Sequence, residues 1–498
     1  MSERNHNIKS DNDFKREEPL SKRVVRGGVW VFTLRIISRL LGLVRTIILA
    51  RLLAPKDFGL FGIAVLAISA LNTFSQTGFQ AALVQKKDNV GSYLDTAWTV
   101  SVIRGIVLFL ILFLSAPVIA KFFNSPHATL IIKVIAISTL LSGFRNIGVM
   151  FFQKELEFNK QFIYEFPATL VDLIVAISLA FILRNAWALV WGGVAANFVR
   201  LFMSYMIHPY RPHVRFDKSE FEELFGFGKW VLGSSILIFL IMEGDDIFVG
   251  KMMGVSALGL YQMAYLVSNL PATEIGHLIS RVTFPAYSKL QDNLPELREA
   301  YLKVLQITAF VSIPLAGGIF ILAPEFTEIF LGDKWMPMVP AIQALVLAGL
   351  VGSIQATTTP IFLAVNRPEI EPRWQAIRLS VLVILIYPFS IQWGICGTSI
   401  AVFFSTLIST LGFSFMVLQI TKCGKRSFLK IIGLPFMNAL FMVVILSILK
   451  NGIPSIEIWQ FTLLIGVGIV TYLCIAYLFD RILNYGIKKI IKGIFSSL

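Results

Sequence analysis

Long apolar segments recur along almost the whole chain, and short polar turns separate them. One helix needs about 20 apolar residues to cross a bilayer core of about 30 Å, and many of these segments are that long. Of the 498 residues, 56% are hydrophobic and 15% are charged, whereas soluble proteins average about 25% charged residues. The sequence therefore predicts an all-α integral membrane protein without a large aqueous domain.

The number and orientation of the spans follow from the apolar segments and the charges between them. If the N-terminus is cytoplasmic, 26 Lys and Arg residues fall in the inner segments and six in the outer ones. This bias matches the positive-inside rule and predicts an even number of spans with both termini cytoplasmic. We predict about fourteen transmembrane helices, near 28–52, 58–84, 93–120, 128–152, 161–183, 186–207, 225–250, 257–287, 297–323, 337–364, 373–390, 394–420, 428–449 and 458–479.

The chain contains an internal repeat. When it is shifted by 200 residues, the first span aligns with the seventh without gaps, so that Gly28 matches Gly228 and Gly59 matches Gly259. Six spans separate the copies, and an even number gives both the same orientation. We therefore predict two six-helix lobes, related by a pseudo-two-fold axis along the membrane normal, plus two C-terminal helices. Such repeats are typical of transporters that rock one half against the other.

The repeat divides the chain into six regions. The inter-lobe region, which contains Pro209 and Pro212, is interpreted as a linker, with an ordinary cytosolic loop as the alternative. The tail after the last span has isoleucines at helical spacing between lysines and predicts a helix on the membrane surface. The regions are a cytosolic tail at 1–27, an N-lobe at 28–207, the linker at 208–222, a C-lobe at 223–421, two helices within 422–480, and an amphipathic cytosolic tail at 481–498.

The first span carries arginines where a charge is costly. An ionised side chain at the centre of a span costs about 2.5–3.5 kcal/mol on insertion scales. Arg35, Arg39 and Arg45 fall on one polar stripe of an otherwise apolar helix. We interpret Arg39 and Arg45 as lining a water-filled cavity. Snorkelling to the headgroups is the alternative, and it suits Arg51 at the end of the span.

Other spans of the first lobe are also basic. Arg104, Arg145 and Arg200 lie within predicted spans, and Asp172 is the clearest counter-charge. Each arginine could also be a salt-bridge or carbonyl partner. A basic cavity suits an anionic ligand, because guanidinium groups bind phosphate oxygens through paired hydrogen bonds.

The second lobe has the opposite charge at matching positions. Asp245 and Asp246 stand where the first copy has Arg45 and Thr46, and Glu243 and Glu274 are nearby. The two lobes are therefore predicted to share a scaffold and to differ in the charge that they present.

The sequence lacks several catalytic and binding motifs. It has no GxxxxGK[ST] or HExxH motif and no Cys or His spacing typical of a metal site. We therefore expect no nucleotide motor, metal or cofactor, and transport driven by gradients. The net charge of +14 is attributed to cytoplasmic loops and not to nucleic-acid binding.

Several segments together resemble one family over about residues 24–420. LARLLAPKDFGLFGIA, GFQAALVQKKD and FQKELEF are similar to the first lobe of Wzx-type polysaccharide exporters. LGSSILIFLIMEGDDIFVGKMMGVSALGLYQMAY, ISRVTFPAYSKLQD and LGDKWMP are similar to the second. The resemblance is to the colanic and teichuronic acid exporter branch of the multidrug/oligosaccharidyl-lipid/polysaccharide superfamily. SRLLGLVR also resembles the arginine motif of lipid II flippases, but LNTFSQTG lacks their further arginine, which makes lipid II itself a weaker candidate.

The resemblance implies a flippase of the bacterial plasma (inner) membrane. Its substrate would be an oligosaccharide repeat unit on a polyprenyl diphosphate, moved from the inner to the outer leaflet for surface polysaccharide synthesis. Membrane lipid would hold the tail, and a polymerase or glycosyltransferase would be a partner. Arg39 and Arg45 would bind the diphosphate, assisted by Arg104 and Arg145. Gating or coupling to Na⁺ or H⁺ would involve the acidic residues Asp172, Asp245, Asp246 and Glu274.

Three other functions stay open at this point. A multidrug extruder of the same superfamily would carry organic cations and would place carboxylates in the cavity. A glycan polymerase or ligase would need outward loops with catalytic residues, and the predicted outer loops are only a few residues long. The third alternative is a lipid scramblase without ion coupling.

Overall fold

The computed structural model describes residues 37–75, 93–155, 157–269, 283–284, 286–453 and 456–483, and every regular element among them is a helix. The prediction of an all-α fold is therefore confirmed. The first helix covers 37–52. The others are α2 (Pro55–Phe74), α4 (Tyr93–Phe122), α5 (Ala128–Ile135), α6 (Ile137–Gly143), η2 (Ile147–Met150), α7 (Phe151–Lys154), α8 (Phe158–Leu183), α9 (Trp187–Ile207), α10 (Lys218–Met252), α11 (Val255–Ser268), α13 (Leu294–Phe326), η3 (Thr327–Leu331), η4 (Asp333–Met338), α14 (Val339–Ala356), α15 (Thr359–Ala364), α16 (Ile370–Ile420), α17 (Lys425–Asn451) and α18 (Ile458–Leu483).

The chain is a multi-pass membrane protein. Within its described residues, nine helices are long and apolar enough to cross a bilayer, and two further apolar helices are shorter, at Ala128–Gly143 and Val255–Ser268. The predicted total of fourteen includes segments outside the described residues, so it stays a prediction. The predicted tail at 1–27 and most of the tail at 481–498 also lie outside them.

Two predicted boundaries can be compared with the structure. The single span at 128–152 is wrong, because the helix ends at Gly143 and a 3₁₀ turn follows. Asn146 has extended backbone, and its side chain accepts a hydrogen bond of 2.9 Å from Gly148 N, which caps that turn. The break predicted between 373–390 and 394–420 is present as a kink in α16 at Gly394, whose φ of 58° favours glycine.

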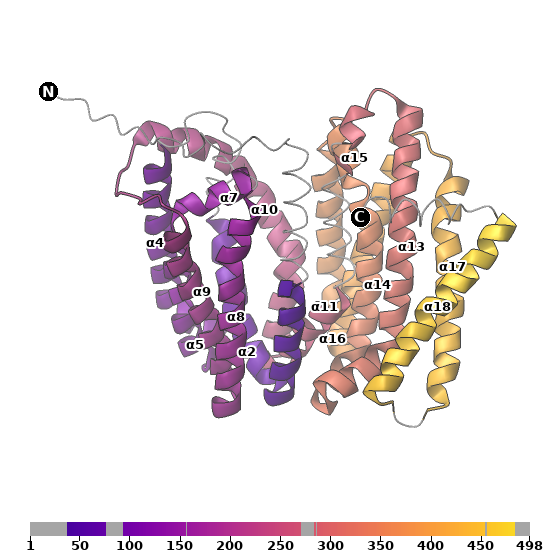
Figure 1. Ribbon diagram of the computed structural model, residues 1–498, viewed down its shortest axis with the longest axis horizontal. Coiled ribbons are helices and arrows are strands. Elements are labelled where there is room, and N and C mark those ends of the chain that lie inside the picture. Colours follow the sequence, from indigo (N-terminus) through magenta and orange to yellow (C-terminus); the bar gives the residue numbers. More distant parts are fainter. Residues whose placement is uncertain are drawn as a thin grey trace.

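The helices form two groups that lie side by side. Figure 1 shows α4, α5, α8 and α9 on one side and α13, α14, α16 and α17 on the other. Within the groups, α8 packs on α9, and α14 packs on α16. Between the groups, α2 packs on α11. The two C-terminal helices, α17 and α18, pack together and against α13.

The contact between α2 and α11 is reciprocal. A Cβ atom on Gly59 would lie 1.8 Å from the carbonyl oxygen of Val255, and one on Gly259 would lie 1.9 Å from that of Pro55. Both pairs are related by the same 200-residue shift. A two-fold relation between lobes produces such reciprocal pairs, and only glycine allows backbones to approach this closely. The contact therefore lies near the pseudo-two-fold axis.

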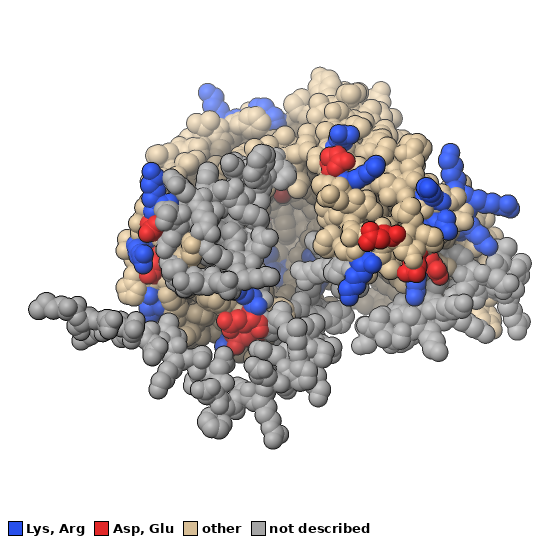
Figure 2. All heavy atoms as spheres, turned by 90° about the horizontal axis from the view of Figure 1, so that it is seen from above, with Lys and Arg blue, Asp and Glu red and all other residues tan. Residues whose placement is uncertain are grey.

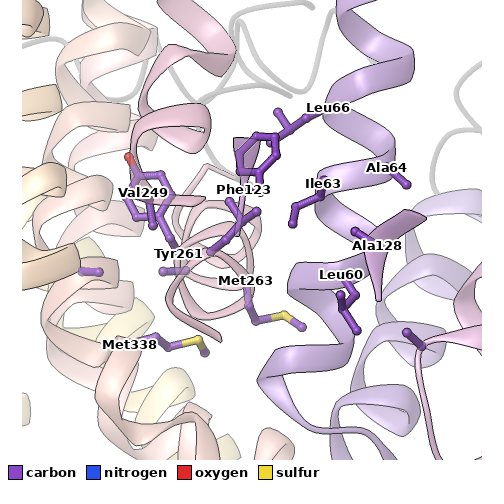
Figure 3. Close-up of a cluster of buried hydrophobic side chains, with 14 of the residues drawn as sticks. Leu60, Ile63, Ala64, Leu66, Phe123, Ala128, Val249, Tyr261, Met263 and Met338 are labelled. Atoms are coloured by element: carbon purple, nitrogen blue, oxygen red, sulfur yellow. The ribbon is translucent and has the colours of Figure 1, made fainter. Parts of the chain in front are cut away.

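Around this glycine contact the two lobes share one hydrophobic core. Figure 3 shows Leu60 and Ile63 of α2 close to Tyr261 and Met263 of α11, with Phe123 from the end of α4 beside them. All five side chains are buried. Burial of apolar surface contributes about 25 cal/mol per Å², so this core holds the two lobes together at one end. We call this end the contact end.

Arg51 strengthens the contact end through backbone carbonyls. It donates hydrogen bonds of 2.9 Å to Phe330 O and 3.1 Å to Glu328 O, and it also donates to Ile329 O. These carbonyls belong to η3, directly after α13, where a helix end leaves its acceptors unsatisfied. Lys334 Nζ returns a bond of 2.8 Å to Arg51 O. Arg51 therefore caps η3, a helical element of the opposite lobe, in addition to the snorkelling suggested by its position.

The segment between the lobes is bound to the N-lobe. Residues 208–217 are not helical, and α10 begins at Lys218. Asp95, at the start of α4, accepts hydrogen bonds from Tyr210 OH and, at 2.8 Å, from His213 N. Thr99 Oγ1 accepts a bond of 3.1 Å from Arg215 N. These hydrogen bonds attach this part of the predicted linker to α4 of the first lobe.

His208 anchors the start of this segment. Its ring stacks on Phe151 at 5.7 Å, and its Nδ1 accepts a hydrogen bond of 3.2 Å from Tyr210 N. Burial, and next the charge of Lys160, lower the pKa of His208 from 6.5. The segment is therefore bound most firmly above about pH 6.5 and loses part of that stability as the pH falls through the lowered pKa.

Asp95→Ala is expected to release this segment. It removes two hydrogen bonds of about 1 kcal/mol each, so local opening should become roughly thirty times more frequent. The readout is the rate of trypsin cleavage after Arg215, which is exposed. Thr99→Val removes one bond and should give a smaller increase. Equal cleavage rates in Asp95→Ala and the unsubstituted protein would contradict this assignment.

Candidate substrate site between the lobes

The lobes touch at the contact end and leave a hollow at the other end. Figure 2 looks from above the view of Figure 1, onto the end opposite the contact end, and the surface is hollowed between the two halves. Polar side chains between the lobes can meet water in such a hollow, which lowers the cost of placing them within a membrane. The predicted site residues can be compared with this geometry one by one.

Arg45 is paired with Asp172. Its Nη2 lies 3.0 Å from Asp172 Oδ1, and the two side chains are 18% and 25% exposed. Gly192 of α9 makes room for this pair, because a Cβ there would lie 2.7 Å from Asp172 Oδ1. Arg45 Nε has no hydrogen-bond partner among the described residues. The guanidinium is thus held in place by one carboxylate and keeps donor capacity for a ligand.

Arg39 lies on the same helix as Arg45 and is exposed. Six residues separate the two, which is about 9 Å along the axis. The helix runs to residue 52 at the contact end, so Arg39 lies nearer to the hollow. The two arginines therefore lie on one helix, with Arg39 nearer to the hollow and Arg45 deeper, where it pairs with Asp172.

Arg104 is used inside the N-lobe. Its Nε donates to Ser75 O at 2.9 Å and to Ser75 Oγ at 3.0 Å, and its Nη2 donates to Asn72 O at 3.2 Å and to Asn72 Oδ1 at 3.1 Å. These acceptors lie at the C-terminal end of α2, whose last carbonyls need donors. The structure therefore gives Arg104 a capping role.

Arg145 is also engaged by neighbouring residues. It follows α6 and donates a hydrogen bond of 2.5 Å to Asn197 Oδ1 on α9. Nearby, Arg200 pairs with Glu165 at 3.0 Å. These contacts join α6, α8 and α9. Arg104 and Arg145 thus share no hydrogen-bond partner with the Arg45–Asp172 pair.

In the C-lobe, the carboxylate of Asp245 accepts two hydrogen bonds. It is 2% exposed and accepts hydrogen bonds of 2.6 Å from Tyr261 OH and 3.1 Å from Asp246 N. Arg378 of α16 interacts with it electrostatically and is 9% exposed. Arg378 was not among the residues predicted from the sequence, although a charge inside the predicted span 373–390 is a signal that identifies such a residue.

Two further carboxylates face the lobe interface. Glu243 Oε1 accepts a hydrogen bond of 3.4 Å from Ser69 on α2. Asp246 interacts with Gln262, whose Oε1 would lie 2.0 Å from a Cβ on Gly62 of α2. Glu274 lies outside the described residues. In the described part of the chain, no three His, Cys, Asp or Glu side chains are arranged to hold a metal ion.

Sequence comparison identifies similar proteins. Residues 48–340 match the family model described as polysaccharide biosynthesis protein. Over 429 residues the chain is 25% identical to the lipopolysaccharide biosynthesis protein WzxC of Escherichia coli K12, covering 86% of this chain and 87% of that protein. It is 26% identical to the teichuronic acid biosynthesis protein TuaB of Bacillus subtilis, covering 63% and 64%.

Structure comparison finds the same two-lobed fold. The structure titled lipid II flippase MurJ, inward closed conformation, superposes with a TM-score of 0.73 at 17% identity. The superposition covers 92% of this chain and 99% of that one. At this identity the similarity concerns the fold, and it agrees with the predicted arrangement of two lobes plus C-terminal helices.

Proposed function

This chain belongs to the polysaccharide biosynthesis protein family, and we propose from this premise that it is a flippase for polyprenyl-diphosphate-linked oligosaccharides. The repeat units would pass from the inner to the outer leaflet and supply surface polysaccharide synthesis. A flippase changes the position of its substrate and no covalent bond, so we propose transport without an enzymatic step.

The observation that carries this proposal is the two-lobed arrangement with an arginine-bearing helix beside its hollow. The lobes touch around Gly59 and Gly259 and leave a hollow at the other end. A diphosphate and its sugars cannot cross about 30 Å of hydrocarbon unaided. Polar groups in the hollow would take the place of the water that hydrates the headgroup, while the polyprenyl tail stays in lipid. Rocking the lobes would then expose the site to the other side.

Arg39 and Arg45 would bind the diphosphate. Two guanidinium groups about 9 Å apart along one helix can reach the two phosphates of one headgroup. Asp172 would hold Arg45 in the binding orientation and would release it to the phosphate. Arg104 and Arg145 would assist in binding the diphosphate. Both donate hydrogen bonds to neighbouring residues of the N-lobe, and Arg145 Nε has no partner among the described residues.

The orientation follows from the charge distribution of the sequence. We propose that both termini are cytoplasmic and that the chain resides in the bacterial plasma membrane. The hollow would then face the cytoplasm, where the repeat unit is made. A negative-inside potential favours outward movement of an anion by about 2.3 kcal/mol per charge per 100 mV.

An ion gradient and protein partners would complete the cycle. The acidic residues Asp172, Asp245, Asp246 and Glu274 are our candidates for gating and for coupling to H⁺ or Na⁺. A polymerase or glycosyltransferase would supply or consume the repeat unit.

Reconstitution tests the function directly. The purified chain in liposomes should make a polyprenyl-diphosphate-linked oligosaccharide on one leaflet accessible to a lectin on the other, without changing its mass. Gradient-driven movement of organic cations, with no lectin signal, would favour the multidrug extruder. A changed glycan mass would favour a polymerase or ligase. Equal movement of ordinary phospholipids would favour a scramblase.

A further inference from the structure

We propose that Asp246 is a proton-binding site whose protonation controls whether the lobes touch at the contact end. We also propose that Arg378, through its interaction with the neighbouring Asp245, prevents metal cations from binding there. This inference rests on the proposed function and specifies its coupling ion. Three carboxylates, Glu243, Asp245 and Asp246, fall within about one turn of α10, and Arg378 of α16 interacts with one of them, Asp245.

Asp245 has two hydrogen-bond donors and one opposite charge as neighbours. Tyr261 OH and Asp246 N donate to its two oxygens at 2.6 and 3.1 Å, and the buried Arg378 supplies the opposite charge. A resident guanidinium repels a second cation at close range, because charges interact strongly where water is scarce. Asp245 is therefore a fixed member of the C-lobe, joined to α11 and α16.

Asp246 lacks this compensation. Its Oδ1 is buried and has no hydrogen-bond partner among the described residues. The ionisable groups that interact with it are Glu243 and Asp245 on α10 and Tyr261 and Tyr265 on α11. Arg378 on α16 interacts with Asp245 and Tyr265, and residues 59–74 of α2 contribute no ionisable group. A buried, uncompensated carboxylate beside like charges is stabilised by taking up a proton. The proton comes from water, and no other bond changes.

Asp246 also senses the position of the lobes. Its partner Gln262 lies against Gly62 of α2, so close that a Cβ there would be 2.0 Å from Gln262 Oε1. Glu243 meets Ser69 of α2 across the same interface. When α2 leaves α11, water reaches Asp246 and the ionised form becomes favourable. Protonation therefore favours the closed contact end, and ionisation favours its opening.

The experiment measures the contact end as a function of pH and needs no transported substrate. The full chain has Cys396, Cys423 and Cys474 replaced by serine and carries spin labels on Lys121→Cys and Asn451→Cys. Both label positions are exposed and lie at the contact end, Lys121 on α4 of the N-lobe and Asn451 on α17, which packs against α13 of the C-lobe. Electron–electron double resonance in liposomes gives the ratio of short to long distances between pH 5.5 and 8.5.

The unsubstituted cluster should show at least a tenfold rise in the short-distance ratio on acidification. Asp246→Asn, which mimics the protonated form, should hold the short distance at every pH, while Asp245→Asn should keep the pH dependence. Replacing potassium by sodium should change nothing unless Arg378→Gln is present. A wild-type pH profile in Asp246→Asn, or a sodium effect at constant pH without Arg378→Gln, would overturn the proposal. Failure of the lectin assay alone would instead concern the proposed substrate.

Discussion

Alanine in place of both Arg39 and Arg45 is expected to slow transport of the lipid-linked repeat unit by at least about a hundredfold. Each charge-assisted hydrogen bond to phosphate contributes about 1.5–3 kcal/mol, and every 1.4 kcal/mol corresponds to a factor of ten. In the native host, surface polysaccharide should disappear and repeat units should accumulate on the inner leaflet. The measurement is lectin accessibility of the repeat unit on intact and on opened cells.

The pair of Arg45 with Asp172 supplies a decisive control. Arg45→Ala leaves the half-buried carboxylate of Asp172 without its partner. Transport would then fall through loss of helix stability even if Arg45 does not bind substrate. The double variant Arg45→Ala with Asp172→Ala removes both charges. If Arg45 binds the diphosphate, this double variant stays inactive. Restored transport would show that Arg45 serves only to neutralise Asp172. Arg184→Ala, in an exposed turn, controls for loss of one positive charge.

Gly59→Val is expected to stop the cycle by holding the contact end apart. Its Cβ would lie 1.8 Å from the Val255 carbonyl oxygen, so backbone must move. Overpacking of this kind costs about 1–3 kcal/mol, and on a contact that must form in every cycle it shifts the lobe equilibrium by about 5- to 150-fold. The spin-label distances at the contact end should lengthen, and transport should fall with them.

Matched glycine variants separate this effect from a general loss of stability. Gly259→Val inserts a side chain on the other half of the same reciprocal contact and should act like Gly59→Val. Gly193→Val lies on α9, where a Cβ meets nothing within 4 Å, and should leave the distances unchanged. Lengthened distances in Gly193→Val, or normal ones in Gly59→Val, would contradict the assignment of the contact end.

The site was only partly predictable, because a charged residue within an apolar segment is evident from the sequence but the residue that pairs with it is not. The arginines of the first span were evident from their position in an apolar segment. That Arg45 pairs with Asp172, 127 residues away, depends on how α8 packs. Arg104 was predicted to bind the ligand from its position in an apolar span, but it donates its hydrogen bonds to the C-terminal end of α2.

Local physics allowed the sequence alone to determine the membrane class, the helical fold and the repeat of 200 residues. Hydrocarbon requires every backbone group to bond within its own helix, and hydropathy along the chain records this requirement. Tertiary structure alone decided where the lobes touch, that residues 208–217 hydrogen-bond to α4, and that Arg378 interacts with Asp245. Each of these depends on distances between residues far apart in the chain, which a linear pattern does not contain.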